Sequence, residues 1–286
     1  MKKSFFKTIE PYLYLFPALF FFTLFVFWPF VKTVRLSLAR TTPLGDVAQY
    51  IGLQNYIDLF KDKSFWNSIL VTFEFAAMMV VLSIVFGFIL AVISNEKIKG
   101  KNVFRTIYAL PMAVSAAAAS VVFAFLFHSS LGILNKALGT QIGWLTDPKW
   151  ALFSVTLVSV WMNIGMNYLY LTAALQSVPQ ELYECASLEG AGFFRKHKDV
   201  TIPCVSPTLF FLLIINMINS MQAYAQFKMM TQGGPSNRTN VIVYEIYQEA
   251  FINSRFGVAC AESVILFILL LILTMIQFKL EKKVTY

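Results

Sequence analysis

Long apolar runs separated by shorter polar segments dominate the pattern of this chain. The hydrocarbon core of a bilayer is about 30 Å thick and an α-helix rises about 1.5 Å per residue, so one span needs roughly 20 apolar residues. Six segments meet this requirement, at residues 12–30, 68–93, 103–127, 151–175, 205–227 and 258–278. The runs are continuous instead of alternating, which favours helices over a β-barrel. The pattern therefore predicts one all-α membrane domain with six transmembrane helices over residues 1–286.

The composition agrees with a membrane protein. Hydrophobic residues make up 58% of the chain and charged residues only 13%, which leaves too little polar surface to cover a soluble domain. The first run follows Lys2 and Lys3, as the apolar part of a secretory signal would. Because that run is long enough to span and five more follow, we interpret it as a membrane span.

The positive charges predict the orientation of the spans. Basic residues gather in segments that would share one side of the membrane, namely Lys2, Lys3, Lys7, Lys97, Lys99, Lys101, Arg105, Arg195, Lys196, Lys198, Lys279, Lys282 and Lys283. By the positive-inside rule, both termini and the loop 178–203 are then cytosolic. The net charge of +8 is explained by anionic lipid at the inner leaflet, so we expect contact with the bilayer and no nucleic acid partner.

Catalytic and metal-binding patterns are missing from the sequence. The cysteines Cys185, Cys204 and Cys260 are isolated and lack the spacing of metal ligands. Gly100-Lys101 is followed by Asn102 and has no glycine five residues upstream, so it is not a phosphate-binding loop. We expect no catalytic residue, no metal and no cofactor in this chain.

The loop between the fourth and fifth predicted spans is unusual. It reads ECASLEGAGFFRKHKDVTIP from Glu184 to Pro203. Ser177 and Gln180 have the spacing of a capping box that would start a helix, Gly190 and Gly192 would end it, and Pro203 would mark re-entry into the membrane.

Phe193 and Phe194 stand side by side in this charged loop. Leaving them in water costs about 1.5–3 kcal/mol each relative to burial, so we expect them to enter a groove of another protein. The alternative is a loop that only determines topology, with its aromatic side chains at the lipid interface.

A longer pattern distinguishes these alternatives. The loop resembles the E-A-A-x-x-x-G cytosolic loop of permease subunits in binding-protein-dependent ABC importers, through Glu184, Cys185, Ala186, Gly190, Val200, Ile202 and Pro203. Further similarities to the carbohydrate-uptake branch are Gly52–Tyr56, Phe65-Trp66, Leu110-Pro111, Gln232–Pro235, Tyr244 and Phe251. Residues 173–179 and 277–284 are most similar to the first permease subunit of glycerol-3-phosphate importers, and multiple-sugar permeases are only slightly less similar.

The resemblance implies a role for each part of the loop and a set of partners. The loop would be a cytosolic coupling helix in a cleft of an ATPase subunit, with Glu184 in a polar contact, Gly190 at the turn, and Phe193 and Phe194 in the cleft. The partners would be a second permease, two ATPase subunits and an external solute-binding protein. The location would be the bacterial cytoplasmic membrane. The cargo would be glycerol 3-phosphate or a related compound, with a sugar as the alternative.

Polar side chains inside the predicted spans are candidates for the cargo path. Amides recur on the fourth and fifth spans as Asn163, Asn167, Asn216, Asn219, Gln222 and Gln226. An amide that faced lipid would have no hydrogen-bond partner, so these side chains face protein or a water-filled path. The alternative is adhesion between helices, worth roughly 0.6 kcal/mol per contact. We interpret the small residues 113–120 as a helix-packing surface, with a place in a cavity wall as the alternative.

Charge gives conflicting indications about the cargo. No Lys or Arg lies deep in a predicted span, and Lys228, just past the fifth, is the nearest cation. The uncharged polar side chains in the spans thus favour a neutral sugar as cargo, whereas the resemblance favours glycerol phosphate. An ion-coupled secondary transporter or a membrane enzyme would need intramembrane carboxylates or clustered catalytic groups, and His128 and His197 stand alone.

Overall fold

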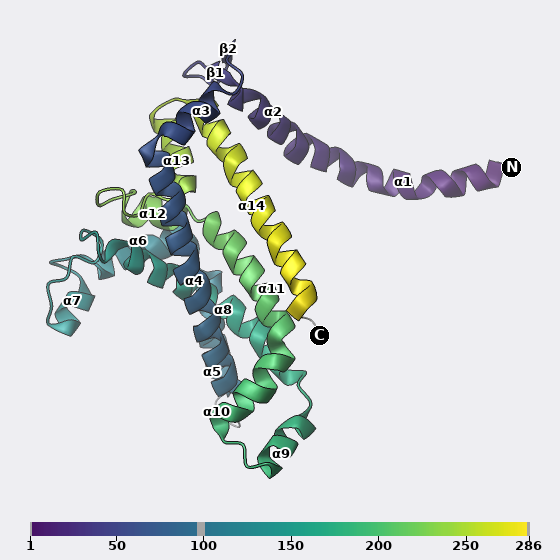
Figure 1. Cartoon of the computed structure of the whole chain (residues 1–286), viewed down its shortest axis with the longest axis vertical. Coiled ribbons are helices and arrows are strands. Elements are labelled where there is room, and N and C mark those ends of the chain that lie inside the picture. Colours follow the sequence, from purple (N-terminus) through teal and green to yellow (C-terminus); the bar gives the residue numbers. More distant parts are fainter. Residues whose placement is uncertain (1, 96–100, 285–286) are drawn as a thin grey trace. The chain divides into compact units, whose positions relative to one another are not determined.

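The structure is a computed structural model that describes the backbone of residues 2–95 and 101–284, and side chains within residues 11–95 and 103–281 (Figure 1). Lys97 and Lys99 lie outside the described residues, and the side chains of Lys2, Lys3, Lys7, Lys101, Lys282 and Lys283 lie outside the described side chains. The chain forms two compact units, one from residues up to Asp62 with Glu245–Ile268, the other from Lys63–Tyr244 with residues from Leu269 onward.

The first unit is helical apart from one antiparallel hairpin. Its elements are α1 (Lys2–Phe22), η1 (Thr23–Phe27), α2 (Trp28–Ser37), β1 (Ala39–Thr41), β2 (Val47–Tyr50), α3 (Gln54–Lys61) and η4 (Gln248–Ile252). Asn55 ties the hairpin to the helices, because its amide nitrogen donates to the carbonyls of Ser37 at 2.8 Å and Ala39 at 3.0 Å. The Gly257 nitrogen donates to Thr41 Oγ1 at 3.0 Å, which fixes the start of the last long helix in the same unit.

The second unit contains most of the helices. Its elements are α4 (Lys63–Asn95), α5 (Lys101–Ala109), η2 (Leu110–Ala113), α6 (Ala116–Leu126), α7 (Ile133–Leu138), α8 (Ala151–Gln176), α9 (Gln180–Leu188), α10 (Phe193–Lys196), η3 (His197–Thr201), α11 (Ile202–Met221) and α12 (Ala225–Met230). Two further helices, α13 (Ile242–Tyr247) and α14 (Phe256–Val284), have residues in both units. The η1, η3 and η4 segments are single π-helical turns, and η2 is a 3-10 turn.

Five helical stretches of the described chain are long and apolar enough to cross a membrane. They are Pro11–Ser37, Lys63–Asn95, Ala151–Gln176, Phe193–Met221 and Phe256–Glu281, and they overlap five of the six predicted spans. The sixth candidate is a bent pair, Val103–Ala113 with Ala116–Leu126. The structure is thus a mostly helical membrane protein with five or six candidate spans.

The third predicted span differs from the continuous helix expected at residues 103–127. Its two halves meet at an angle of 102°. Pro111 lies in the 3-10 turn and has no amide hydrogen to continue an α-helix. Ser115 then starts a new helix, because its extended backbone and its hydroxyl, which accepts from Ala118 N at 3.3 Å, form an N-cap. A count of apolar residues does not detect such a break.

The fifth span is displaced from its predicted range. We expected residues 205–227, whereas the helical stretch covers Phe193–Met221. At its start, the π-turn η3 continues α10 into α11 without a break. At its end, the chain leaves the helix at Gln222, and α12 begins separately at Ala225. Gln222 and Gln226 are therefore beyond α11.

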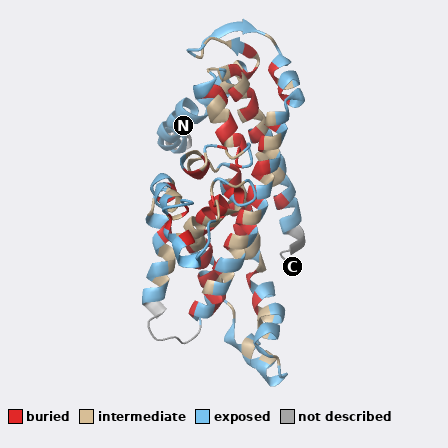
Figure 2. Ribbon diagram, turned by 90° about the vertical axis from the view of Figure 1, so that its left-hand side faces the viewer, coloured by how far each residue is buried: buried red, intermediate tan, exposed pale blue. Residues whose placement is uncertain are grey.

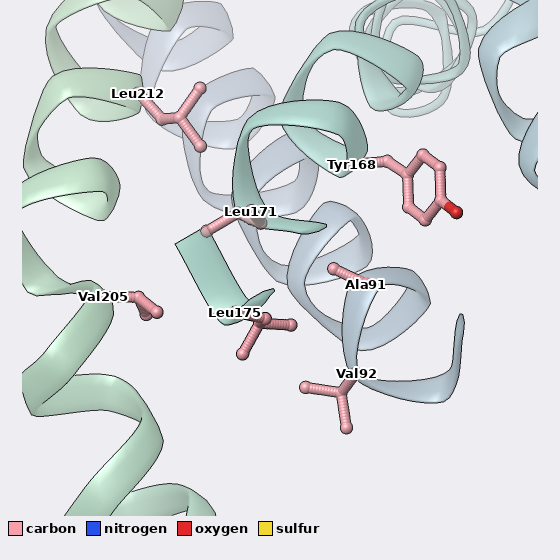
Figure 3. Close-up of a cluster of buried hydrophobic side chains, with 7 residues drawn as sticks. All are labelled: Ala91, Val92, Tyr168, Leu171, Leu175, Val205 and Leu212. Atoms are coloured by element: carbon pink, nitrogen blue, oxygen red, sulfur yellow. The ribbon is translucent and has the colours of Figure 1, made fainter. Parts of the chain in front are cut away.

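The centre of the second unit is the contact between α4, α8 and α11. Buried positions run along these helices, whereas the α9–α10 end of the unit is mostly exposed (Figure 2). Towards that end, α4 contributes Ala91 and Val92, α8 contributes Leu171 and Leu175, and α11 contributes Val205 and Leu212 to an apolar cluster that also holds Tyr168 (Figure 3). These side chains interlock the three helices.

Small residues set the spacing between α4 and α8. Ser83, Gly87 and Ala91 are buried on α4 at intervals of four residues, so they form one row along the helix. A Cβ atom at Gly87 would lie 2.6 Å from the Cβ of Asn167 on α8. Small residues at such intervals allow two membrane helices to approach closely.

Replacing Gly87 with Val should force α4 and α8 apart. Overpacking of this kind costs about 1–3 kcal/mol, so the unfolding midpoint of the detergent-solubilised protein should fall. The control is Ala77→Val, which also ends in a valine but adds its two γ-methyl groups at an exposed position of the same helix. Equal thermal midpoints for the two variants would contradict a close α4–α8 contact at Gly87.

Candidate functional site

Two asparagines join α8 and α11 inside the second unit. Asn167 Nδ2 donates to Asn216 Oδ1 at 3.2 Å, and Asn216 Nδ2 donates to Asn167 Oδ1 at 2.7 Å. Each amide also donates to the carbonyl four residues earlier in its own helix, Asn163 for one and Leu212 for the other. Asn167 is 1% exposed and Asn216 is 2% exposed. Their hydrogen bonds are satisfied within the protein, as adhesion between helices requires.

The other candidate amides line a cavity of about 360 Å³ in the same unit. Asn163 contributes from α8, Asn219 from the last turn of α11, Gln222 from its C-cap and Gln226 from α12. The remaining walls come from Phe75, Met79, Ala116, Ser159, Ser220, Ala223, Tyr224 and Ala225. The structure therefore divides the predicted path residues into a buried pair and a group of four around a cavity.

The break after α11 explains how Gln226 reaches this cavity. The backbone of Tyr224 leaves the helical conformation with φ −135°, and α12 follows at once. Phe227 then packs edge-to-face on Phe75 of α4, with ring centroids 4.8 Å apart, and this contact holds α12 in place. The described residues that line the cavity carry no charge, so its hydrogen-bonding groups are neutral amides, hydroxyls and backbone.

Two charged side chains, Glu74 and Lys228, lie beside the described lining of the cavity without forming part of it. Glu74 is exposed on α4, next to the cavity-lining Phe75. Lys228 lies over the ring of Tyr224, with its Nζ 5.5 Å from the ring centroid. Lys228 thus contacts a side chain that lines the cavity.

The predicted coupling loop forms two short helices, α9 and α10, with a sharp turn between them. Gly190 has φ +78°, the left-handed conformation that favours glycine. The Ala191 nitrogen donates to the Ala186 carbonyl at 2.9 Å and the Gly190 nitrogen to the Ser187 carbonyl at 3.0 Å, which together form a Schellman motif. The glycine in the sequence therefore ends α9 as predicted, and Gly192 is the N-cap of α10.

The predicted capping box at the start of α9 is not formed. The N-cap is Pro179, and the Ser177 hydroxyl donates instead to the Ala174 carbonyl at the end of α8. Gln180 donates from Nε2 to Glu184 Oε1 at 3.1 Å, one helical turn further on. Because α8 runs to Gln176, Ser177 is used to finish that helix and is not available to start the next.

Large apolar side chains of the α9–α10 segment point to solvent. Leu188 is 89% exposed, Phe194 is 86% exposed and Phe193 is 55% exposed. Figure 1 shows the two helices at the end of the unit where α11 begins. Neighbouring exposed apolar side chains on a charged segment are typical of a protein interaction site. We call Leu188, Phe193 and Phe194 the docking surface.

Comparisons with known proteins identify the family of this chain. Residues 83–286 match the family described as binding-protein-dependent transport system inner membrane component. This chain belongs to that family. The permease is 35% identical over 281 residues to the sn-glycerol-3-phosphate transport system permease protein UgpA of Yersinia pestis, covering 96% of this chain and 95% of the relative. It is 32% identical to the UgpA protein of Agrobacterium fabrum over 283 residues, covering 97% of each chain.

Solved structures share the fold of the permease. One chain of a bacterial ABC transporter involved in the import of the acidic polysaccharide alginate superposes with a TM-score of 0.85 at 22% identity, covering 99% of this chain and 100% of that chain. A chain of the MetNI methionine ABC transporter gives a TM-score of 0.57 at 19% identity, with 82% of this chain and 99% of that chain covered. The permease is thus a transport component of an inner membrane, and an ion-coupled transporter is not supported.

Sequence reasoning missed a polar cluster of the permease before α14. Arg255 donates from Nη2 to Glu249 Oε1 at 2.6 Å, and Asn253 Nδ2 donates to the same oxygen at 2.8 Å. The hydrogen bond to Glu249 raises the pKa of Arg255. The signal was Glu249, Asn253 and Arg255 within seven residues, in the segment between the fifth and sixth predicted spans. Among the side chains that the structure describes, no three His, Cys, Asp or Glu are placed to hold a metal ion.

A double-mutant cycle can test the amide pair. Asn167→Ala and Asn216→Ala each leave a buried amide without its partner, so each should lower stability, and the double variant should cost less than the sum. The expected coupling is about 0.6 kcal/mol, measured from thermal unfolding in detergent. Asn163→Ala with Asn219→Ala is the control cycle, with coupling near zero. Independent effects of Asn167 and Asn216 would contradict their hydrogen bond.

Proposed function

We propose that this permease and a second permease chain form the membrane path of an ATP-driven importer. An external solute-binding protein delivers the cargo, and two separate ATPase subunits hydrolyse ATP. The family match over residues 83–286 carries this proposal. The missing phosphate-binding loop supports separate ATPases, because this chain lacks the residues to bind nucleotide in that way.

The docking surface is the contact with an ATPase subunit. Burial of an exposed phenylalanine or leucine contributes about 1.5–3 kcal/mol, and α9 and α10 expose three such side chains within seven residues of sequence. Glu184, which is exposed and carries the Gln180 hydrogen bond, supplies a polar contact beside them. Ala186, Gly190 and Gly192 form the turn that presents the aromatic pair, and Pro203 begins the return into the membrane.

The orientation follows from this assignment. An ATPase works in the cytosol, so the α9–α10 end of the second unit is cytosolic and the cavity lies towards the external end of α11. The basic residues Arg195, Lys196 and Lys198 next to the docking surface support this direction under the positive-inside rule. Both termini are then cytosolic as well.

The cargo is glycerol 3-phosphate or a related glycerol phosphate. Support comes from full-length similarity to permeases of sn-glycerol-3-phosphate transport systems. One observation favours a neutral sugar instead, because the described lining of the cavity has amides and hydroxyls but no cation. Lys228 reconciles the two, since it lies on Tyr224 at the cavity wall and can attract a phosphate without being buried in the path.

Uptake by the reconstituted complex tests the proposed function. Labelled glycerol 3-phosphate should enter vesicles when ATP and the binding protein are present, and collapse of the proton gradient should not stop it. Uptake that needs the gradient and not ATP would sink the proposal. Labelled oligosaccharides in parallel vesicles separate the two cargo classes.

The coupling assignment predicts the effect of removing both aromatic rings. The double substitution Phe193→Ala with Phe194→Ala deletes most of the exposed apolar area of the docking surface, so binding of the ATPase should weaken by several kcal/mol. Glu184→Ala should weaken it less. Stimulated ATP hydrolysis and uptake should fall together. The control Phe125→Ala removes an equally exposed ring from α6. Undiminished stimulated turnover in the double variant would contradict the assignment.

The path assignment makes a separate prediction. Asn163→Leu and Asn219→Leu place apolar groups in the cavity wall, so uptake should slow while the complex still assembles. The measurement is the concentration dependence of uptake in vesicles, with bound ATPase as the check on assembly. Unchanged kinetics in both variants would return these amides to a packing role.

A further inference from the structure

A buried threonine connects the docking helices to the long helix that follows them. Thr201 is 0% exposed and is the last residue of the π-turn η3, directly before α11. Its Oγ1 lies 2.9 Å from the hydroxyl oxygen of Tyr183 on α9 and 2.9 Å from Nδ1 of His197 at the start of η3. One hydroxyl therefore links α9 to the segment between α10 and α11.

These bonds differ from the usual behaviour of threonine in a helix. A threonine hydroxyl inside a helix commonly donates to the carbonyl four residues earlier. Thr72, Thr156 and Thr274 do so in the long helices, with distances of 2.6–2.8 Å. Thr201 instead meets two side chains, while the His197 carbonyl accepts from the Ile202 nitrogen in the π-turn. The wider turn thus leaves the hydroxyl for contacts beyond its own backbone.

The hydroxyl can serve both partners at once. It has one proton and two acceptor sites, so Tyr183 can donate to Thr201 while Thr201 donates to a neutral His197 ring. The His197 ring in turn supports the docking surface, since the ring of Phe193 stands edge-on to it with centroids 4.4 Å apart. On α4, Phe88 is a second aromatic neighbour, with centroids 6.5 Å apart. The network therefore runs from α9 through Thr201 and His197 to a residue of the docking surface.

We propose that Thr201 is a positioning residue that makes α9 move together with the continuous helix formed by α10, η3 and α11. This inference rests on the proposed function. A helix as short as α9 is not stable alone, and the glycine turn that joins it to the continuous helix α10–η3–α11 gives no stiffness. Hydrogen bonds at Thr201 supply that stiffness, so that displacement of the docking surface by an ATPase reaches α11. The far half of α11 carries Asn216, bonded to α8, and Asn219 at the cavity.

The test is Thr201→Val, which keeps the side-chain shape and removes the hydroxyl. The importer complex would be purified by an affinity tag on this chain and reconstituted in vesicles with its binding protein. Labelled glycerol 3-phosphate would be the cargo. We expect cargo imported per ATP hydrolysed to fall about five-fold, while the ATPase subunits stay bound. Thr201→Ser should restore the ratio. Tyr183→Phe should reproduce part of the loss and add nothing to Thr201→Val.

Hydrogen–deuterium exchange of the purified full-length chain gives a readout that does not depend on the cargo. Amides of α9 should exchange about five-fold faster in Thr201→Val. The matched control is Ser206→Ala, which removes a partly exposed hydroxyl that donates to the Pro203 carbonyl in the first turn of α11.

Each outcome has a distinct meaning. The inference would be overturned if Thr201→Val kept the wild-type exchange rate in α9 or the wild-type ratio of cargo to ATP. It would also be overturned if Thr201→Ser were as impaired as Thr201→Val, because the loss of packing would then explain the effect. Failure of the wild-type complex to bind ATPases or to hydrolyse ATP would instead sink the proposed function, and the exchange result would still decide the role of Thr201.

Discussion

The close contact of α4 with α8 at Gly87 is the constraint on which the second unit depends. Lipid gives two apolar helices no hydrophobic reason to associate, so packing and hydrogen bonds must hold them together. Without a side chain at Gly87, the backbone of α8 at Asn167 can approach α4. Asn167 is then positioned to exchange hydrogen bonds with Asn216 on α11. Three helices are thereby aligned at one depth.

That alignment separates an apolar region from a polar one. On the side of α9 and α10, the helices interlock through a cluster that includes Leu171, Leu175 and Leu212. On the other side, Asn163 is one turn from Asn167 and Asn219 is one turn from Asn216, and both line the cavity. The amide pair therefore lies between the apolar cluster and the cavity-lining residues, and α11 carries one amide of the pair, carries Asn219 of the cavity wall and begins directly after Thr201. A small rotation of α11 would change all three.

The sequence could predict which faces of the helices are polar but not whether a polar residue on such a face contacts a cavity or another helix. A spacing of four residues places Asn163 and Asn167 on one face of α8, yet one lines a cavity and the other is sealed by Asn216, because the partner lies 49 residues away in the chain. Apolar length predicted the spans, but the 102° bend depends on Pro111 and the Ser115 cap, which a hydropathy average ignores. The turn at Gly190 was predictable because it is local. The Tyr183–Thr201–His197 network was not, because it depends on a π-turn.

An uncharged cavity is compatible with a phosphate cargo when selection and conduction are separate tasks. A path must bind cargo well enough to admit it and weakly enough to release it. A buried cation in the cavity wall would hold phosphate strongly in a low dielectric and slow its exit. Neutral amides such as Asn163 and Gln226 offer hydrogen bonds of modest strength, and the flexible ammonium of Lys228 lies on Tyr224 at the wall. Under the proposed function, a binding protein therefore makes the selection, and the permease needs only a polar surface that cargo can leave.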